Sequence, residues 1–511
     1  MSFSNVLSAV LQGMDVRLVS VEADLSNGLP MFHMVGYLSA EVKEAGERVR
    51  TAIRNSGLEI PAKKTVINLS PADIRKRGAS FDLPIALAIL ASLGLVGRAR
   101  LEKTLVIGEL GLDGRVCRCT GILPIVAAAK KEGCRACIVP FENAKEAAII
   151  GQIQVIGVKC LAEVYRYLNG EISFEDAGYV EDMTDKESGD SLDFRDIYGQ
   201  EAAKRAAEIA VAGRHNLLLM GPPGSGKSLL SKRIPSILPT LTMEESIEIT
   251  KVYSVAGLLK KEHPLITERP FREVHHTVSK AALIGGGSLP KPGEISLASG
   301  GVLFLDELAE FQKSVLEALR QPLETREIQL VRSQGNFRFP ADVMLVAAMN
   351  PCPCGYYPDL EKCCCTPYQI RQYLYKVSQP FLSRMDICME VPGLKYEELQ
   401  RKPQGESSAD IRKRIMQARK IQRKRFAGAK FAFNAGITAA EIEEYCELDS
   451  EGKRMMSQVF DRMELTARTY HKILKVARTI ADLAGEDRIR TEHLTEAVGY
   501  RMMDKKYWGR V

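Results

Sequence analysis

The chain has 511 residues, too many for one hydrophobic core, so we expect two or three domains. Its 45% apolar and 26% charged content is ordinary for a soluble globular protein and argues against a membrane-bound, fibrous or disordered class. A net charge of +6 permits a polyanionic partner without demanding one.

The first region, residues 1–172, alternates short apolar runs with helical patterns, which predicts an α/β or α+β front domain. Its start lacks the pattern of an export signal, so the twelve cysteines of the chain are expected as cytoplasmic thiols or metal ligands. The longest apolar run, Leu83–Gly97, is shorter than a membrane span and contains Pro84, so it predicts a core helix. Residues 173–194 are acidic and turn-rich, which predicts a flexible linker.

A second α/β block, residues 195–395, contains three near-continuous apolar runs: Asn216–Met220, Val302–Leu305 and Val343–Asn350. Such runs are typical of strands buried on both faces, so we expect a parallel sheet flanked by helices. The remainder, residues 396–511, is charged and has helical periodicity, which predicts a helical connector and a lid.

The first apolar run leads into "GPPGSGKS" and then into a helical pattern. This strand–loop–helix order matches the phosphate loop, in which backbone N–H groups and a helix N-terminus surround phosphate oxygens. Lys227 is expected to reach the β- and γ-phosphates of ATP, and Ser228 to hold Mg²⁺. The predicted nucleotide-binding residues are Gly221, Pro222, Pro223, Gly224, Ser225, Gly226, Lys227, Ser228 and Leu229.

The other two runs also end in polar residues. Asp306 is expected to support Mg²⁺, and Glu307 to act as the general base that polarises the attacking water. Asn350 follows the next run, at the sheet edge where open α/β proteins bind ligands, and would orient the water or sense the γ-phosphate. The alternative for Asn350 is a turn-forming residue before Pro351.

Between these two runs, Arg326–Pro340 predicts a β-hairpin, because alternating apolar residues flank the turn residues Gln334–Asn336. No acidic residue occurs from Ile328 to Ala341, and Arg332 and Arg338 lie on either side of the turn. Both are candidate contacts to DNA phosphates. The alternative is a hairpin packed on its own domain, with solvated arginines.

Five cysteines follow Asn350 within a short stretch. Cys352, Cys354, Cys363 and Cys365 could supply four thiolates to a structural zinc ion, which leaves Cys364 spare. The spacing is tighter than in common zinc knuckles, so a set of reduced loop thiols is the alternative.

The segment Ile411–Lys430 carries nine basic residues and no acidic one. A run of this kind is usually a solvated helix face, and the alternatives are a nucleic-acid contact or a subunit contact.

Taken in order, these motifs resemble the AAA+ ATPases, and more narrowly the magnesium-chelatase-like branch that includes the ComM-like (YifB/ComM) group. The specific markers are Gly285–Glu307 and the hairpin before the Asn350 strand, which this branch shares with the MCM helicases. The resemblance implies that Arg384, in "FLSRMD", is an arginine finger acting on a neighbouring subunit, and that Arg468 holds the sensor-2 position. It also implies a homohexameric ring.

The front domain resembles the Lon protease domain over Arg75–Leu90, and Ser80 falls at the nucleophile position. Serine needs a neighbouring base, and Leu123 stands where Lon carries its lysine. Lys130 and Lys131 come about two helical turns later, too far to substitute. We therefore expect an inactive, Lon-like scaffold.

These resemblances imply an ATP-hydrolysing ring motor that acts on single-stranded or branched DNA, of the type of a ComM-like branch-migration helicase in recombination or natural transformation. The alternative is a chelatase-type motor that remodels a protein partner, and an active Lon-like protease ranks third. The front domain favours DNA, because it is expected in the ComM-like group and not in the chelatase motor subunit.

Overall fold

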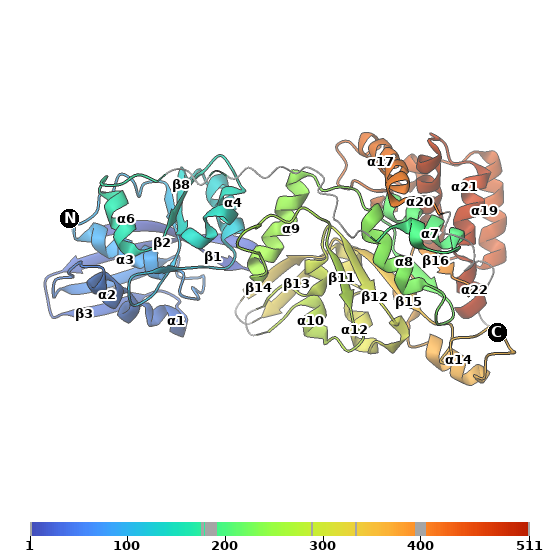
Figure 1. Cartoon of the computed structure of the whole chain (residues 1–511), viewed down its shortest axis with the longest axis horizontal. Helices are drawn as coiled ribbons and strands as arrows, with labels where there is room; N and C mark the ends of the chain where they lie inside the picture. The colour runs from blue at the N-terminus through green and yellow to red at the C-terminus, as the bar shows by residue number, and fades with distance from the viewer. Residues whose placement is uncertain are drawn as a thin grey trace.

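The computed structural model describes residues 3–174, 178, 192–287, 290–332, 335–393 and 405–508. Most of the predicted acidic linker, and the hairpin residue Gln334, lie outside the described residues. Figure 1 shows an elongated molecule in which the front region, a central α/β core and a helical end follow one another along the long axis. No helix in the described ranges combines the length and apolar character that a membrane crossing requires.

The front region is built on a seven-stranded mixed sheet with strand order β3-β4-β2-β1-β5-β8-β9. Antiparallel pairing joins β1 to β2 and β2 to β4, whereas β3/β4, β1/β5, β5/β8 and β8/β9 are parallel. The strands are β1 (Phe3–Gln12), β2 (Asp15–Ser26), β3 (Met31–Val35), β4 (Lys64–Ser70), β5 (Thr104–Val106), β8 (Ala136–Pro140) and β9 (Gln154–Val158). A small separate pair consists of β6 (Glu109–Leu110) and β7 (Val116–Cys117).

Six helices accompany this sheet: α1 (Ala40–Lys43), α2 (Ala45–Asn55), α3 (Asp82–Ser92), α4 (Ile122–Lys131), α5 (Ala144–Ala148) and α6 (Leu161–Leu168). All eleven residues of α3 are buried, so the prediction of a core helix from the apolar run is confirmed. At the N-terminus of α3, Asp82 is fully buried and its carboxylate accepts two hydrogen bonds, of 2.8 and 2.9 Å, from the guanidinium of Arg48.

The central core contains a five-stranded sheet with order β11-β12-β15-β10-β16, and every pairing in it is parallel. Its strands are β10 (Leu217–Met220), β11 (Phe271–Val274), β12 (Val302–Leu305), β15 (Met344–Met349) and β16 (Ile387–Glu390). Every residue of β10, β12 and β15 is buried, as expected for apolar strands covered on both faces. The predicted parallel α/β sheet is therefore confirmed.

The helices of this core are α7 (Glu201–Gly213), α8 (Lys227–Arg233), α9 (Met243–Ala256), α10 (Lys280–Ile284), α11 (Glu294–Leu297), α12 (Lys313–Ala318), α13 (Pro322–Thr325), α14 (Pro367–Leu374) and α15 (Gln379–Leu382). Between α13 and β15 the predicted hairpin is present as β13 (Glu327–Arg332) and β14 (Gly335–Pro340), paired antiparallel with Arg332 opposite Gly335. Ile328, Phe337 and Phe339 face the core and are buried.

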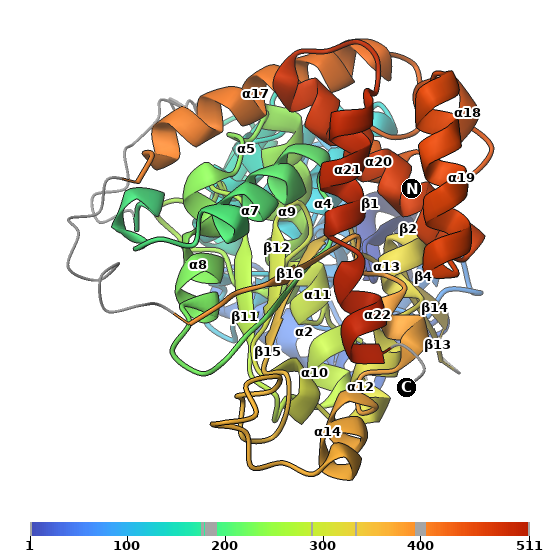
Figure 2. The same ribbon diagram turned by 90° about the vertical axis from the view of Figure 1, so that its right-hand side faces the viewer.

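The C-terminal end is helical, as predicted, with α17 (Ser408–Arg425), α18 (Ile442–Tyr445), α19 (Ser450–Met463), α20 (Ala467–Ala484), α21 (Thr491–Gly499) and α22 (Met502–Trp508). Figure 2 shows α17 to α21 across this end of the core, with α22 running down toward α14. There the indole N–H of Trp508 donates to the Leu374 carbonyl at 3.3 Å.

The basic helix α17 is held against its own chain. Arg414 lies 2.6 Å from Glu208, Arg425 lies 2.6 Å from Asp482, and Arg412 donates to the Ser236 carbonyl. Arg419 is 5% exposed, and its guanidinium stacks 3.5 Å from the ring centre of Phe433. A wholly solvated face is therefore wrong for this helix, because these four arginines serve as intramolecular contacts.

Candidate active site

The predicted phosphate loop connects the end of β10 to the start of α8, as the sequence pattern requires. A side chain at Gly221 would come within 2.0 Å of the Val391 carbonyl, so only glycine fits beside the end of β16. Gly226 has a φ of +90°, and a side chain there would meet open space, so the outer face of the loop is accessible. The loop geometry therefore suits close approach of a phosphate group.

Lys227 is 8% exposed, and its ammonium donates to the carbonyls of Gly221 and Pro222 at 2.8 Å and weakly to the Ser225 hydroxyl at 3.4 Å. Burial lowers the pKa of Lys227 to about 8, although the Asp306 carboxylate opposes the shift. A buried cation whose hydrogen-bond acceptors are neutral is suited to an incoming anion.

Ser228 and Asp306 meet across the site. The Ser228 hydroxyl donates to Oδ2 of Asp306 at 2.7 Å, and the backbone N–H of Glu307 donates to Oδ1 at 2.9 Å. A hydroxyl and a carboxylate at this separation are oxygen ligands of the kind Mg²⁺ prefers. Together with Lys227 and the open loop, they fit a magnesium–nucleotide complex. In that complex Ser228 and Asp306 would hold the ion, which neutralises phosphate charge.

Glu307 follows β12 in the left-handed region, with φ of +52°, and its side chain is 60% exposed. Its Oε2 lies 3.3 Å from Nδ1 of His276. His276 comes just after β11, the neighbour of β12, so the carboxyl ends of these parallel strands bring the two residues together. Sequence reasoning missed His276. The polar His275–His276 pair after a short strand was the available signal.

Asn350 comes directly after β15, which lies between β12 and β10 in the sheet. Asn350 therefore sits at the same sheet edge as Glu307 on one side and the phosphate loop on the other. The backbone N–H of Gly221 donates to the carbonyl of Met349, which ties the loop to this strand at 3.2 Å. Leu229, the last predicted loop residue, is 46% exposed on α8.

The two predicted arginines form a separate group. Arg384 is 8% exposed, and its Nη2 lies 2.9 Å from Oε1 of Glu324, a residue of α13. Arg468, at the start of α20, donates to the same carboxylate oxygen. In the described part of the chain neither arginine contacts Lys227, Asp306 or Glu307. The trans role of Arg384 stays a prediction, and Glu324 is a contact that the sequence did not indicate.

Comparisons with known proteins show which family this chain resembles. Three family models match the chain: "Magnesium chelatase, subunit ChlI" over residues 193–399, "Subunit ChlI of Mg-chelatase" over 21–143, and "Magnesium chelatase, subunit ChlI C-terminal" over 405–501. The competence protein ComM of Haemophilus influenzae is 43% identical over 506 residues, which is 98% of both chains. YifB of Escherichia coli is 41% identical over 509 residues, 99% of this chain and 98% of its own.

The chain belongs to the magnesium-chelatase-like AAA+ family. It is an ATPase of the ComM and YifB type, and ATP and Mg²⁺ are the cofactors that this family implies. A family model that carries the chelatase subunit's name also covers residues 21–143. The expectation that a front domain separates ComM-like proteins from the chelatase motor subunit therefore gains no support. Lon protease 2 of Bacillus subtilis is 31% identical over 200 residues, 34% of this chain and 35% of its own, a weak likeness.

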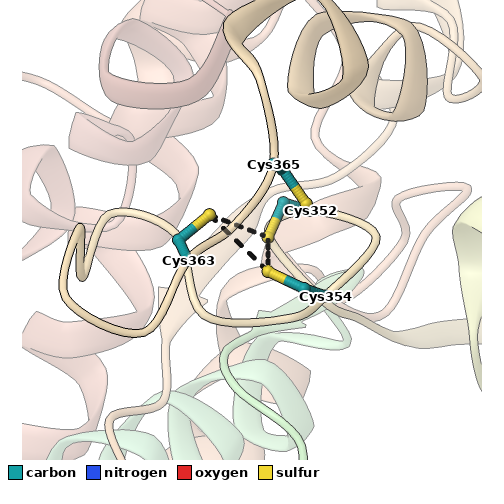
Figure 3. A group of neighbouring side chains, drawn as sticks. All are labelled: Cys352, Cys354, Cys363 and Cys365. Carbon is teal, nitrogen blue, oxygen red and sulfur yellow. Dashed lines mark hydrogen bonds between the residues drawn. The ribbon is translucent and has the colours of Figure 1, made fainter.

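The cysteine cluster lies in the loop between β15 and α14. The Sγ atoms of Cys352, Cys354, Cys363 and Cys365 all lie within 4.8 Å of one another (Figure 3), and three of the pairs are 3.3, 3.6 and 3.8 Å apart. Tetrahedral zinc with Zn–S bonds of about 2.3 Å needs sulfurs about 3.8 Å apart, so the cluster fits that ion. The backbone N–H groups of Gly355 and Tyr357 donate to Sγ of Cys352.

Cys364 is exposed and is not part of this group of four thiols, in line with its prediction as the spare cysteine. The loop that carries the cluster also touches the phosphate loop. A side chain at Gly355 would come within 2.5 Å of Cδ of Pro223, so the two loops pack closely.

Ser80 lies on the wall of a front-domain cavity whose lining contains arginines and Glu109 but no lysine or histidine among the described residues. Leu123, where Lon-like proteins carry a lysine, is fully buried against Ile149 and against Leu265 of the ATPase core. Its backbone N–H donates to Glu146 at 3.1 Å. The position of the missing base is thus used for contact between the domains, and Lys130 instead reaches the Ile150 carbonyl.

The hairpin that carries the DNA-contact candidates also touches the front domain. The backbone N–H of Met14, in the β1–β2 turn, donates to the Arg338 carbonyl at 3.1 Å, and Gly13 bridges to Arg338. Arg332 is exposed, and the side chain of Arg338 is 61% exposed with Glu327 at 3.7 Å. Both guanidiniums can therefore reach a ligand outside the molecule.

Proposed function

We propose that this ATPase is a ring-shaped motor that acts on single-stranded or branched DNA, as a branch-migration helicase in recombination or natural transformation. The observation that carries the proposal is the connection of β14 to β15. Two exposed arginines stand on the hairpin, and the strand that follows it ends at Asn350 between the phosphate loop and Glu307. A shift of Asn350 when nucleotide binds or is hydrolysed would therefore be carried along β15 into the hairpin that holds the two arginines.

In ATP hydrolysis, each residue of the nucleotide site would have a separate role. Lys227 and the loop N–H groups would bind phosphate oxygens, and Ser228 and Asp306 would hold Mg²⁺ as two of its oxygen ligands. Glu307 takes a proton from the attacking water, and Asn350 positions that water. His276 holds the Glu307 side chain at 3.3 Å, so reorientation of Glu307 toward the water requires this contact to open.

Ring assembly supplies the remaining part of the site. We propose a homohexamer in which Arg384 completes the neighbour's site, with Arg468 beside it. The common contact of both arginines with Glu324 supports this pairing. To act on a neighbour, Arg384 must leave its ion pair with Glu324 and contact the phosphates of the nucleotide bound by the neighbouring subunit.

The four-thiol cluster is proposed to hold a structural zinc ion, which fixes the loop that packs on Pro223. All twelve cysteines are free thiols, which suits the cytoplasm, the compartment that we propose.

A chelatase-type motor that remodels a protein partner is the second candidate, favoured by the descriptions of all three family models. The decisive assay is ATP hydrolysis by the purified protein with no DNA, with single-stranded DNA and with a branched junction. A DNA motor should hydrolyse faster with at least one DNA, most with its preferred structure. Equal rates in all three conditions would favour the protein-remodelling candidate.

A further inference from the structure

The cavity around Ser80 is a feature that the ATPase mechanism does not use. Its volume is about 380 Å³, within the usual range for small-molecule sites. It is formed by the end of β1, the loop before α3, the segment from the end of β5 into β6, the β7–α4 connection with the start of α4, and one residue of the ATPase hairpin. The residues used in the argument are Arg75, Arg77, Ser80, Glu109, Arg118 and Phe337.

Positive charge dominates this cavity. Its charged lining consists of three arginines and Glu109, an excess of two positive charges. Burial lowers the pKa of Arg77, and repulsion from the Arg75 guanidinium lowers it further, against the attraction of the Glu41 carboxylate. Nε of Arg75 is buried without a hydrogen-bond partner among the described residues. Cationic groups held together at partial burial repel one another, and a bound anion would relieve that repulsion.

The shape and remaining chemistry favour one class of anion. Guanidinium groups bind phosphate oxygens in paired hydrogen bonds, and a phosphomonoester dianion matches the excess of two charges. The hydroxyls of Ser80 and Thr120 offer further donors at the wall. The apolar side chains of Ile107, Ile125 and Phe337 line the cavity too, so a ligand with a flat or apolar part also fits.

The cavity is joined to the ATPase. Phe337 belongs to β14 and is 6% exposed, and its neighbour Arg338 accepts the hydrogen bond from Met14. Figure 1 shows the hairpin at the boundary between the front region and the ATPase core. A ligand in the cavity therefore touches the element that leads to Asn350.

We propose that this arginine-lined cavity binds a phosphate group, as a second anion site distinct from the phosphate loop. The phosphate comes either from a free nucleotide or from a DNA strand at the hairpin. The site goes beyond the proposed motor function, because the cavity can bind a free nucleotide whether or not the protein moves DNA.

Binding is measured by calorimetry on full-length Lys227→Ala protein, in which the phosphate loop is weakened. The probes are inorganic phosphate, thymidine 5′-monophosphate, thymidine, acetate, and a thymidine tetranucleotide with and without a 5′-phosphate. Phosphate-bearing probes should saturate one site, and thymidine and acetate should not. Saturation by tetranucleotides alone would assign the phosphate to a strand. Saturation by phosphate or the mononucleotide would assign it to a free ligand.

Adding Arg75→Ala and Arg118→Ala should weaken that binding by about tenfold or more for each arginine lost. The matched control Arg135→Ala removes an exposed arginine of the same domain and should change it less than about twofold. Ser80→Glu adds a carboxylate to the cavity wall with little loss of packing, so it should also weaken phosphate binding. This variant tests the proposal if the double arginine variant fails to fold. The proposal fails if no phosphate probe saturates, if acetate binds equally well, or if the arginine and Ser80 variants bind like the control.

Discussion

At the scale of single residues, the nucleotide site is built where the parallel strands of the central sheet end. Lys227, Ser228 and Asp306 follow apolar strands, and a parallel sheet brings the carboxyl ends of its strands to one edge, so their meeting follows from sequence order. His276 and Glu324 were not predictable in the same way. Each depends on which elements adjoin: β11 beside β12, and α13 beside α15 and α20. One sequence does not specify those neighbours.

Replacing the base tests the chemistry at this scale. Glu307→Gln should bind ATP normally and lower the hydrolysis rate by about 100-fold or more, because only the proton acceptor is lost. Lys227→Ala should weaken nucleotide binding itself. Nucleotide affinity and single-turnover hydrolysis separate the two effects. Wild-type turnover by Glu307→Gln would show that another group is the base.

His215 gives a pH dependence to stability. Its ring is fully buried and lies 2.7 Å from the Thr479 hydroxyl, and burial lowers its pKa from 6.5 to about 4, against the pull of Asp386. The unfolded chain takes up a proton near pH 6.5 and the folded one does not. This stability is therefore present above pH 6.5 and is lost as the pH falls toward 4.

Between pH 7.5 and pH 5.5, the free energy of unfolding should fall by about 1.4 kcal/mol because of this group. In urea unfolding, the free energy of unfolding of His215→Gln should fall by about that much less between pH 7.5 and pH 5.5 than that of the wild type. Glutamine does not titrate in this range. His33→Gln, at an exposed position, should keep the acid loss of the wild type. Equal acid losses in wild type and His215→Gln would mean that the buried ring is protonated in the folded protein.

At the scale of elements, the hairpin and the buried strands could be read from alternation and apolar runs, since those patterns are local. The basic helix α17 could not, because four of its arginines find partners on other elements or in the following loop, where sequence shows only a charge run. The cysteine pattern, in contrast, identified the same four thiols that the loop brings together, although their spacing differs from that of common zinc knuckles.

Zinc content tests the cysteine loop. Purified protein should contain about one zinc per chain by elemental analysis. The Cys354→Ser/Cys363→Ser variant should lose the metal and bind ATP more weakly, because the loosened loop packs on Pro223 through Gly355. Cys364→Ser, which changes the exposed spare thiol, should keep both properties. Well under one zinc in the wild type would leave a cluster of reduced thiols.

At the scale of the whole molecule, the order of domains was readable from composition, but their contacts were not. In the sequence, Leu123 stands where Lon-like proteins carry their catalytic lysine. In the structure, it packs at the contact between the front domain and the ATPase core. Likewise the hairpin contacts the front domain through Met14, whereas the sequence suggested either DNA contacts or packing on its own domain.

The ring is tested by mixing inactive subunits. Arg384→Ala lacks the finger and Lys227→Ala lacks the phosphate loop, so mixed rings contain some sites built from an intact loop and an intact finger. Their ATPase activity should exceed the sum of the two separate variants. No excess in rings shown by native mass spectrometry to be mixed would mean that Arg384 acts within its own chain.

The central claim is that the hairpin couples ATP hydrolysis to DNA, and branch migration of a synthetic four-way junction by Arg332→Ala/Arg338→Ala tests it most directly. Basal ATPase should stay near the wild-type rate. DNA binding should weaken, its salt dependence should fall by up to about two phosphate contacts, and migration per ATP should drop. The control Lys260→Ala/Arg371→Ala removes two exposed charges elsewhere on the core and should migrate junctions normally. Wild-type binding and migration by the hairpin variant would contradict the account.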